Sequence, residues 1–338
     1  MTPTTPAFAA GASSTALAPG GRRRRVLMII SRYGTLIGLL GMIVAFSIKA
    51  PTTFLTVPNF LNILNQGSLT AIIAAGLTMT LVVGEFDLSI GYVASFAGLL
   101  VVGFIARDGL PVLIGIPLVL LIGAAIGTVN GVLVTKVRIN AVIATLGVGT
   151  ILVGAGFAYS SFPIASGVPA EFIAISLGKP ILGIPNPIFI MLIVLAILWV
   201  ILNKTDLGQK MQAVGGNIEA ARLSGIRVDR VKIFAFATAG VCAAITGTLL
   251  SSLLGSGTLA AADGYLLDAF AAVFLGSATL RDGEFHILGT LIGVLIIAVG
   301  FNGLSIFGAP TFFQPIFKGA ILVLAVGLST LARRYSKA

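Results

Sequence analysis

One polar stretch, residues 204–232, divides two long apolar blocks, and its centre reads Gly215-Gly216-Asn217-Ile218-Glu219-Ala220-Ala221-Arg222-Leu223-Ser224-Gly225. The pattern predicts a very short capped helix. Asn217 is a good N-cap, and Glu219 lies in the first turn, where the positive end of a helix favours a carboxylate. Arg222 lies in the last turn, and Gly225 supplies the left-handed residue that ends many helices. A helix of about two turns is not stable alone in water, so the membrane body, a partner or both must hold it.

The composition defines a membrane protein. The chain has 338 residues, of which 57% are hydrophobic and only 9% are charged, whereas soluble domains carry about 25% charged residues. The net charge of +10 does not indicate nucleic-acid binding, because the basic residues lie almost wholly between and beyond the apolar runs, as orientation signals do. The single Cys242 excludes a disulfide within one chain, and the single His286 argues against a histidine-based metal site.

Apolar runs long enough to cross a bilayer as helices follow one another along the chain. The sequence predicts an all-α polytopic bundle with about ten spans, at about 33–49, 64–84, 88–106, 110–135, 141–160, 187–203, 233–253, 264–280, 286–305 and 311–332. Ten spans put both termini on one side of the membrane. That side carries seventeen Lys and Arg residues and the other side three, with Lys318 inside the last span. The positive-inside rule therefore predicts cytosolic termini and a cytosolic loop 204–232.

Two regions are expected. Residues 1–32 are rich in Ala, Pro, Thr, Ser and Gly and carry a basic cluster, so we interpret them as a disordered basic cytosolic tail. A cleaved signal peptide is the rival interpretation, which fits poorly because the basic region comes late. Residues 33–333 form the transmembrane domain. Outside the spans, Thr56 is a possible cap for a helix beginning near Pro58, and the loop 161–186 has room for a short helix near Glu171.

Small residues recur at helical spacing inside the spans. Gly123, Gly127 and Gly131 share one face of the fourth span, and Gly289 and Gly293 share one face of the ninth. This spacing lets helix backbones approach closely in lipid, so bundle packing is the first interpretation and a moving interface the second. The chain has no P-loop pattern, so any ATP that drives it is hydrolysed by another chain.

Acidic residues near the membrane are few. We place Asp87 in a tight cytosolic turn before the third span, where it caps the span with Ser89 nearby or acts in gating. Asp268 lies about 7 Å inside the eighth span, where a carboxylate faces a cavity or a partner, or makes a structural hydrogen bond. No pair of acids is spaced as a proton relay, and no catalytic or metal-ligand constellation occurs, so the sequence predicts neither an enzyme nor a metal site.

Three blocks carry a resemblance to a known family. They are the turn Gly84-Glu85-Phe86-Asp87-Leu88-Ser89-Ile90-Gly91, the run Ile139-Asn140-Ala141-Val142-Ile143-Ala144-Thr145-Leu146-Gly147, and the stretch from Asp206-Leu207-Gly208 through Gly215-Gly216-Asn217 and Ser224-Gly225-Ile226 to Lys232. Over about residues 35–333 the chain resembles permease subunits of ribose-type ATP-binding-cassette (ABC) importers. It departs from that pattern at Glu85 and Phe86, and in the charged loop 281–286, which puts the details of gating and partner fit in question.

The resemblance implies a permease in the bacterial inner membrane that pairs with a second copy or a paralogous permease. A cytosolic ABC ATPase would dock beneath and a periplasmic sugar-binding protein above, and ATP and Mg would bind the ATPase, with no cofactor on this chain. The implied coupling residues are Gly216, Asn217, Glu219, Ala220, Ala221, Arg222 and Gly225. The candidates for the translocation path or its gate are Asp87, Ser89, Asn130, Asp268 and Asn302.

The expected substrate is a monosaccharide or a similar small polyol, moved by alternating access. The alternative is an ion-coupled secondary transporter of a small polar solute, and a membrane scaffold without transport is a third hypothesis. Further polar residues in the spans are Asn65, Gln66, Ser68 and Ser256, each of which is equally suited to satisfy a neighbouring backbone group. The sequence leaves the particular sugar open, because most selectivity in such importers lies in the binding protein.

Overall fold

The computed structural model describes residues 21–277, 283–310 and 312–336, and these form helices joined by short connections, without a strand. In chain order the helices are α1 (Gly21–Lys49), α2 (Pro51–Phe54), α3 (Val57–Val82), α4 (Ile90–Val102) continued by the π-helical η1 (Gly103–Arg107), α5 (Val112–Val132) continued by the π-helical η2 (Leu133–Val137), α6 (Ala141–Tyr159), α7 (Ala170–Leu177), α8 (Asn186–Lys204), α9 (Asp206–Gly216), α10 (Ile218–Leu223), α11 (Val228–Leu254), α12 (Asp263–Ser277), α13 (Ile287–Ile306) and α14 (Phe313–Ser336).

Seven helices of the described part are long and apolar enough to cross a membrane, namely α3, α4 with η1, α5 with η2, α6, α8, α11 and α13. The multi-pass, all-helical class is therefore confirmed. Each of the ten predicted spans matches one helix, the other three being α1, α12 and α14. Among these, α12 is described from Asp263 to Ser277, and the rest of the predicted span 264–280 lies outside the described residues. The count of ten stays a prediction.

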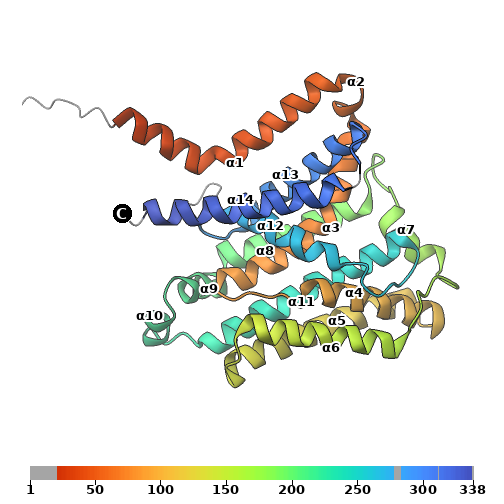
Figure 1. Cartoon of the computed structure of the whole chain (residues 1–338). Helices are drawn as coiled ribbons and strands as arrows, with labels where there is room; N and C mark the ends of the chain where they lie inside the picture. The colour runs from red at the N-terminus through yellow and green to blue at the C-terminus, as the bar shows by residue number, and fades with distance from the viewer. Residues whose placement is uncertain (1–20, 278–282, 311, 337–338) are drawn as a thin grey trace, which may run out of the picture.

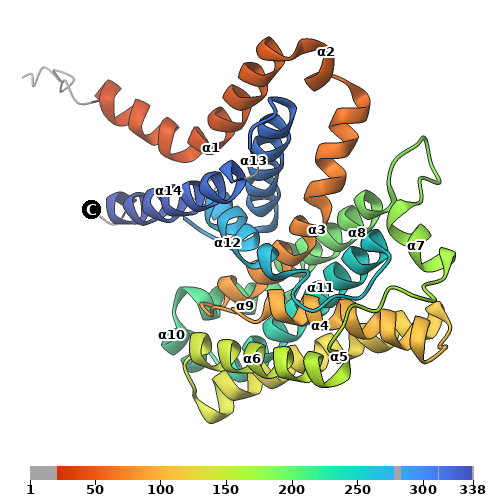
Figure 2. The same ribbon diagram turned by 45° about the vertical axis from the view of Figure 1, so that its right-hand side comes forward.

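Helix α11 lies at the centre of the bundle and packs against α3, α4 and α5, while α12 joins α13, α14 and α3 in a second group (Figures 1 and 2). The predicted small-residue faces form these contacts. A Cβ on Gly127 would lie 2.2 Å from the carbonyl oxygen of Phe236 on α11. On α13, a Cβ on Gly293 would lie 2.0 Å from the carbonyl oxygen of Ala272 on α12. The glycine faces are confirmed as helix-packing surfaces, because no larger side chain fits there.

The two ends of the bundle differ. Helices α9 and α10 project at one end and α7 lies at the other, and the start of α1 and the end of α14 are at the α9–α10 end (Figures 1 and 2). Helix α1 begins at Gly21, so the part of the expected tail from 21 to 32 has helical backbone, and residues 1–20 lie outside the described residues.

The short outer helix near Glu171 is confirmed as α7, and Thr56 caps α3 by accepting a hydrogen bond from the Asn59 N–H.

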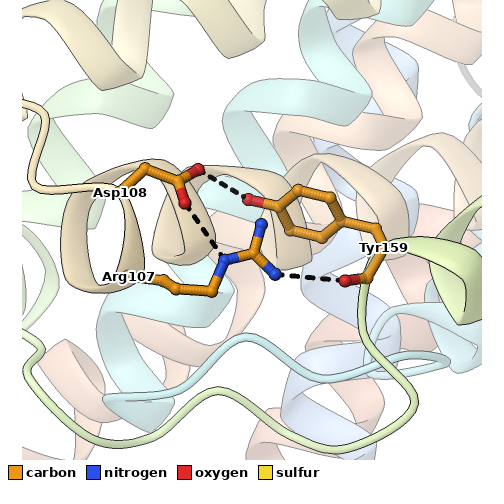
Figure 3. Close-up of polar contacts among 3 residues, drawn as sticks. All are labelled: Arg107, Asp108 and Tyr159. Atoms are coloured by element: carbon orange, nitrogen blue, oxygen red, sulfur yellow. Dashed lines mark hydrogen bonds and ion pairs between the residues drawn. The ribbon is translucent and has the colours of Figure 1, made fainter.

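At the α7 end a polar cluster ties the end of η1 to the end of α6 (Figure 3). Arg107 Nε donates to Asp108 Oδ1 at 3.1 Å, and the Tyr159 hydroxyl donates to Asp108 Oδ2 at 3.2 Å. The guanidinium also donates to the Tyr159 carbonyl at 3.1 Å and lies 4.0 Å from the centre of the tyrosine ring. These contacts close an exposed network around a single carboxylate.

Candidate functional site

Helix α10 is the short capped helix that the sequence predicts. Asn217 has extended backbone, and its side-chain oxygen accepts from the Ala220 N–H at 3.0 Å. At the other end Gly225 has a φ of +80°, and its N–H donates to the Arg222 carbonyl at 2.9 Å. The side chain of Ser224 adds a bond to the Ala220 carbonyl at 2.9 Å. The predicted N-cap and the left-handed stop are both confirmed.

The surface of α10 is open to solvent in the single chain. Ala221 is buried and anchors the helix, whereas Glu219 and Arg222 are exposed, and Leu223 is 90% exposed. An exposed leucine next to exposed charges, on a helix too short to be stable alone, is typical of a docking element. The remaining predicted coupling residues, Gly216, Asn217, Ala220 and Gly225, are also exposed.

Sequence reasoning missed α9, the helix that holds α10. Thr205 caps α9 by accepting from the Gly208 N–H at 3.2 Å, and Lys210 pairs with Asp206 one turn earlier. Both are ordinary helix signals, and they were readable from Thr205 and Asp206 in the sequence. Helix α9 packs directly against the end of α3. The contact is so close that a Cβ on Gly215 would lie 1.8 Å from the Val82 carbonyl oxygen.

The connection between α3 and α4 is longer than the tight turn that the sequence predicts. Helix α3 ends at Val82 and α4 begins at Ile90, so seven residues join them, and in Figure 1 the trace runs from beside α9 to the start of α4. Gly84 has a φ of +83° and lets the chain leave α3. Glu85 forms an ion pair with Lys232 of α11, which ties this connection to the end of the polar stretch. The wrong expectation arose because the apolar run continues past the end of α3.

A buried polar network holds the end of this connection and brings together three predicted path residues. The Oδ1 atom of Asp87 accepts from the Ser89 N–H at 2.9 Å and from the Ser89 hydroxyl at 2.6 Å. Asn130 on α5 donates from Nδ2 to Ser89 Oγ at 2.8 Å, and Thr145 on α6 accepts from the Leu88 N–H at 3.1 Å. All four polar side chains are buried, and the connection thereby locks α4 to α5 and α6.

Asp87 is 1% exposed, and no cation pairs with it among the described residues. It lies in the connection between two spanning helices. Burial raises the pKa of Asp87 from 3.8 to about 6, and the two hydrogen bonds from Ser89 oppose part of that rise. The predicted capping role is therefore replaced by a turn in which Asp87 binds Ser89, the residue directly before α4.

The other two path candidates lie elsewhere. Asp268 on α12 forms an ion pair with Lys318 on α14, with 2.7 Å between Nζ and Oδ1, and Lys318 lies 5.7 Å from the Phe301 ring. Asn302 on α13 exchanges two hydrogen bonds with Asn59 on α3, at 2.7 and 3.0 Å. Asp268 therefore joins α12 to α14, and Asn302 joins α13 to α3. Lys318 is a partner that sequence reasoning did not find, because the pairing spans fifty residues of chain.

Part of the charged loop 281–286 lies outside the described residues, namely Arg281 and Asp282. His286, at its end, is buried rather than solvated, and its Nδ1 accepts from the Gly289 N–H at 2.8 Å at the start of α13. His286 therefore caps α13.

The described chain is thus a multi-pass helical membrane protein with a projecting capped helix. The family model for the branched-chain amino acid transport system permease component matches residues 59–326, so the chain belongs to this family of transport permeases. The ribose import permease RbsC of Haemophilus influenzae is 40% identical over 294 residues, covering 86% of this chain and 90% of that protein.

Other relatives carry related names. The ribose import permease RbsC of Bacillus subtilis is 38% identical, covering 88% of this chain and 92% of that protein. The L-arabinose transporter permease AraH of Azospirillum brasilense is 33% identical, covering 96% and 94%. No solved structure matches the chain. The resemblance to ribose-type ABC permeases that the sequence motifs indicate is confirmed.

Proposed function

We propose that this chain is the membrane-spanning subunit of an ATP-driven importer for a monosaccharide or a similar small polyol. The support is the family together with relatives named for ribose and arabinose import. The observation that carries the proposal is α10, an exposed capped helix on a chain that has no P-loop of its own. The ATP and Mg would be bound by a separate ABC ATPase, and this chain would bind no cofactor.

The geometry suggests how a push on α10 reaches the bundle. Helix α10 follows α9 with only Asn217 between them, and α9 rests on Val82 at the end of α3. Glu85 in the next segment is paired with Lys232 near the start of α11. A displacement of α9 and α10 by an ATPase would therefore act on the α3–α4 connection and on α11 together, and through them on the buried network at Asp87.

The orientation follows from charge. The α9–α10 end carries most of the basic residues, so we place it in the cytosol, with the N- and C-termini on the same side and ten crossings in the bacterial inner membrane. A second permease, identical or paralogous, would complete the channel. A periplasmic sugar-binding protein would dock at the α7 end.

The test is a double variant of α10, Glu219→Ala/Arg222→Ala, assembled with its ATPase in vesicles. Both side chains are exposed, so the variant should insert and fold normally. We expect sugar uptake to fall at least tenfold, while the ATPase still hydrolyses ATP without moving sugar. The measurements are uptake of labelled sugar and release of phosphate from the same vesicles.

The matched control is Asp206→Ala/Lys210→Ala, which removes one acid and one base from the neighbouring α9. This control should transport normally. Normal uptake by the α10 variant would exclude α10 as the coupling contact. Uptake that follows a proton or sodium gradient without any ATPase would instead establish a secondary transporter.

A further inference from the structure

A basic cleft lies beside α10 and shares only Arg222 with the proposed coupling residues. It has a volume of about 400 Å³ and lies between the end of η2 and the start of α11. Its charged lining residues are Lys136, Arg138, Arg222, Arg227, Asp229 and Arg230. Five of these six side chains are basic, which gives the cleft a strongly positive field.

The arginines of this cleft are open to a ligand. Lys136 forms an ion pair with Asp229, with 2.6 Å between Nζ and Oδ2. Arg138, Arg227 and Arg230 are exposed, and within the described part of the chain none of them forms an ion pair. Arg138 also has a φ of +64°, a left-handed conformation that is uncommon for a residue other than glycine. Several guanidinium groups around one small space suit a phosphate, which accepts paired hydrogen bonds from each.

The first turn of α11 adds a second attraction for an anion. Arg227, Val228, Asp229 and Arg230 line the cleft and are the N-cap and first turn of this 27-residue helix, and no side chain caps it. The Val228 N–H donates to the Ile226 carbonyl and the Arg230 N–H to the Arg227 carbonyl, so the attraction for a negative charge comes from the dipole of the long helix. Helix and arginines therefore act on the same space.

Next to the cleft, α5 offers an apolar surface. Its exposed side chains Leu118, Leu121, Val129 and Val132 lie on one face, opposite the glycines that pack on α11. This face leads along the helix into η2, whose Thr135 and Lys136 line the cleft. An anionic head beside an apolar stripe matches the shape of a phospholipid, with its acyl chains along α5.

We propose that this cleft binds the phosphate of an anionic phospholipid from the leaflet at the α9–α10 end. The inference rests on the proposed orientation, which puts the cleft at the cytoplasmic leaflet. Its test changes Arg227 and Arg230 and leaves both Glu219 and Arg222 intact, so it is separate from the test of coupling. A bound lipid would hold η2 and the start of α11 together beside the docking helix.

The test compares the full-length chain with Arg227→Ala/Arg230→Ala in nanodiscs of phosphatidylcholine doped with phosphatidylglycerol. Native mass spectrometry counts the phosphatidylglycerol molecules retained by each chain. We expect the affinity of the variant for phosphatidylglycerol to fall on the order of tenfold, because each arginine near an anionic lipid adds favourable energy. The control Lys204→Ala/Lys210→Ala removes two positive charges from the same polar stretch outside the cleft and should retain the lipid like the wild type.

A second variant distinguishes loss of lipid binding from misfolding of the chain. Arg227→Lys/Arg230→Lys keeps both charges, so it should retain more lipid than the alanine variant and melt like the wild type in pure phosphatidylcholine. Equal retention by all variants would overturn the proposal. Displacement of the lipid by low millimolar inorganic phosphate would identify a free-phosphate site instead. Loss of ATPase binding with unchanged lipid retention would assign the cleft to the partner protein and would also overturn the proposal.

Discussion

Helix α4 and its continuation η1 have a carboxylate network at each end, and the two networks are built differently. At the start, Asp87 is 1% exposed and, among the residues that the structure describes, accepts hydrogen bonds only from the uncharged groups of Ser89. At the end, Asp108 has a side chain that is 41% exposed, and it is paired with Arg107 and bonded by Tyr159. The buried network gains strength from low polarity and loses heavily when a partner is removed, whereas water screens the exposed one.

The largest effect is expected from Ser89→Ala, which breaks the buried network in its middle. The change removes the hydroxyl that donates to Asp87 and accepts from Asn130. The Nδ2 group of Asn130 then lacks a partner and Asp87 keeps only the backbone N–H of residue 89, so we expect the free energy of unfolding to fall by about 3 kcal/mol. Equilibrium unfolding by a denaturing detergent in mixed micelles measures this loss.

Thr150→Ala provides the control for that experiment. Thr150 is an exposed residue of α6 whose hydroxyl bonds only within its own helix. Its removal should leave the free energy of unfolding unchanged within about 0.5 kcal/mol. A Ser89→Ala variant as stable as this control would mean that the buried network contributes nothing to stability.

The sequence predicted those parts of the molecule that depend on local chemistry. The helix α10 with its cap at Asn217, the cap at Thr56 and the glycine faces all follow from residue type and spacing. The buried network did not follow in the same way, because Asn130 and Thr145 reach it from separate helices. Residue patterns do not encode which distant side chains meet. For the same reason the pairing of Asp268 with Lys318 and the arginine cleft emerged only from the fold.

The contacts of the predicted site residues likewise depend on the fold and not on local sequence. Of the five predicted path residues, Asp87, Ser89 and Asn130 come together in one cluster. Asp268 and Asn302 each link a pair of helices instead. A lone polar residue in a span therefore predicts a polar partner more securely than it predicts a path for the substrate.

A smaller effect, which depends on pH, is expected from Asp87→Asn. The pKa of Asp87 is about 6 in the folded chain and 3.8 in the reference state. Between these values the folded chain binds the proton more tightly, so wild-type stability should rise as the pH falls from 7 to 4 and be lost again as the pH rises through 6. The gain should be on the order of 2 kcal/mol. The asparagine side chain does not titrate, so the variant should lack this slope.

Detergent unfolding at several pH values between 4 and 7 measures the difference between wild type and Asp87→Asn. Only that difference is informative, because other acids titrate in both proteins and cancel. Asp108→Asn serves as the parallel control, since it removes a carboxylate of the same type from the exposed end of the helix. Parallel pH curves for wild type and Asp87→Asn would show that Asp87 does not carry the slope.

The smallest effect is expected from Asp108→Asn. This change removes the charge that faces Arg107 but keeps an oxygen that accepts from the Tyr159 hydroxyl. The guanidinium retains its bond to the Tyr159 carbonyl and its position over the ring. We therefore expect a loss of at most about 1 kcal/mol in the free energy of unfolding at low salt, and less at high salt, where exposed charges are screened. A loss as large as that of Ser89→Ala, or one that salt does not reduce, would mean that the two ends of the helix depend equally on their carboxylates, and burial would not be what separates them.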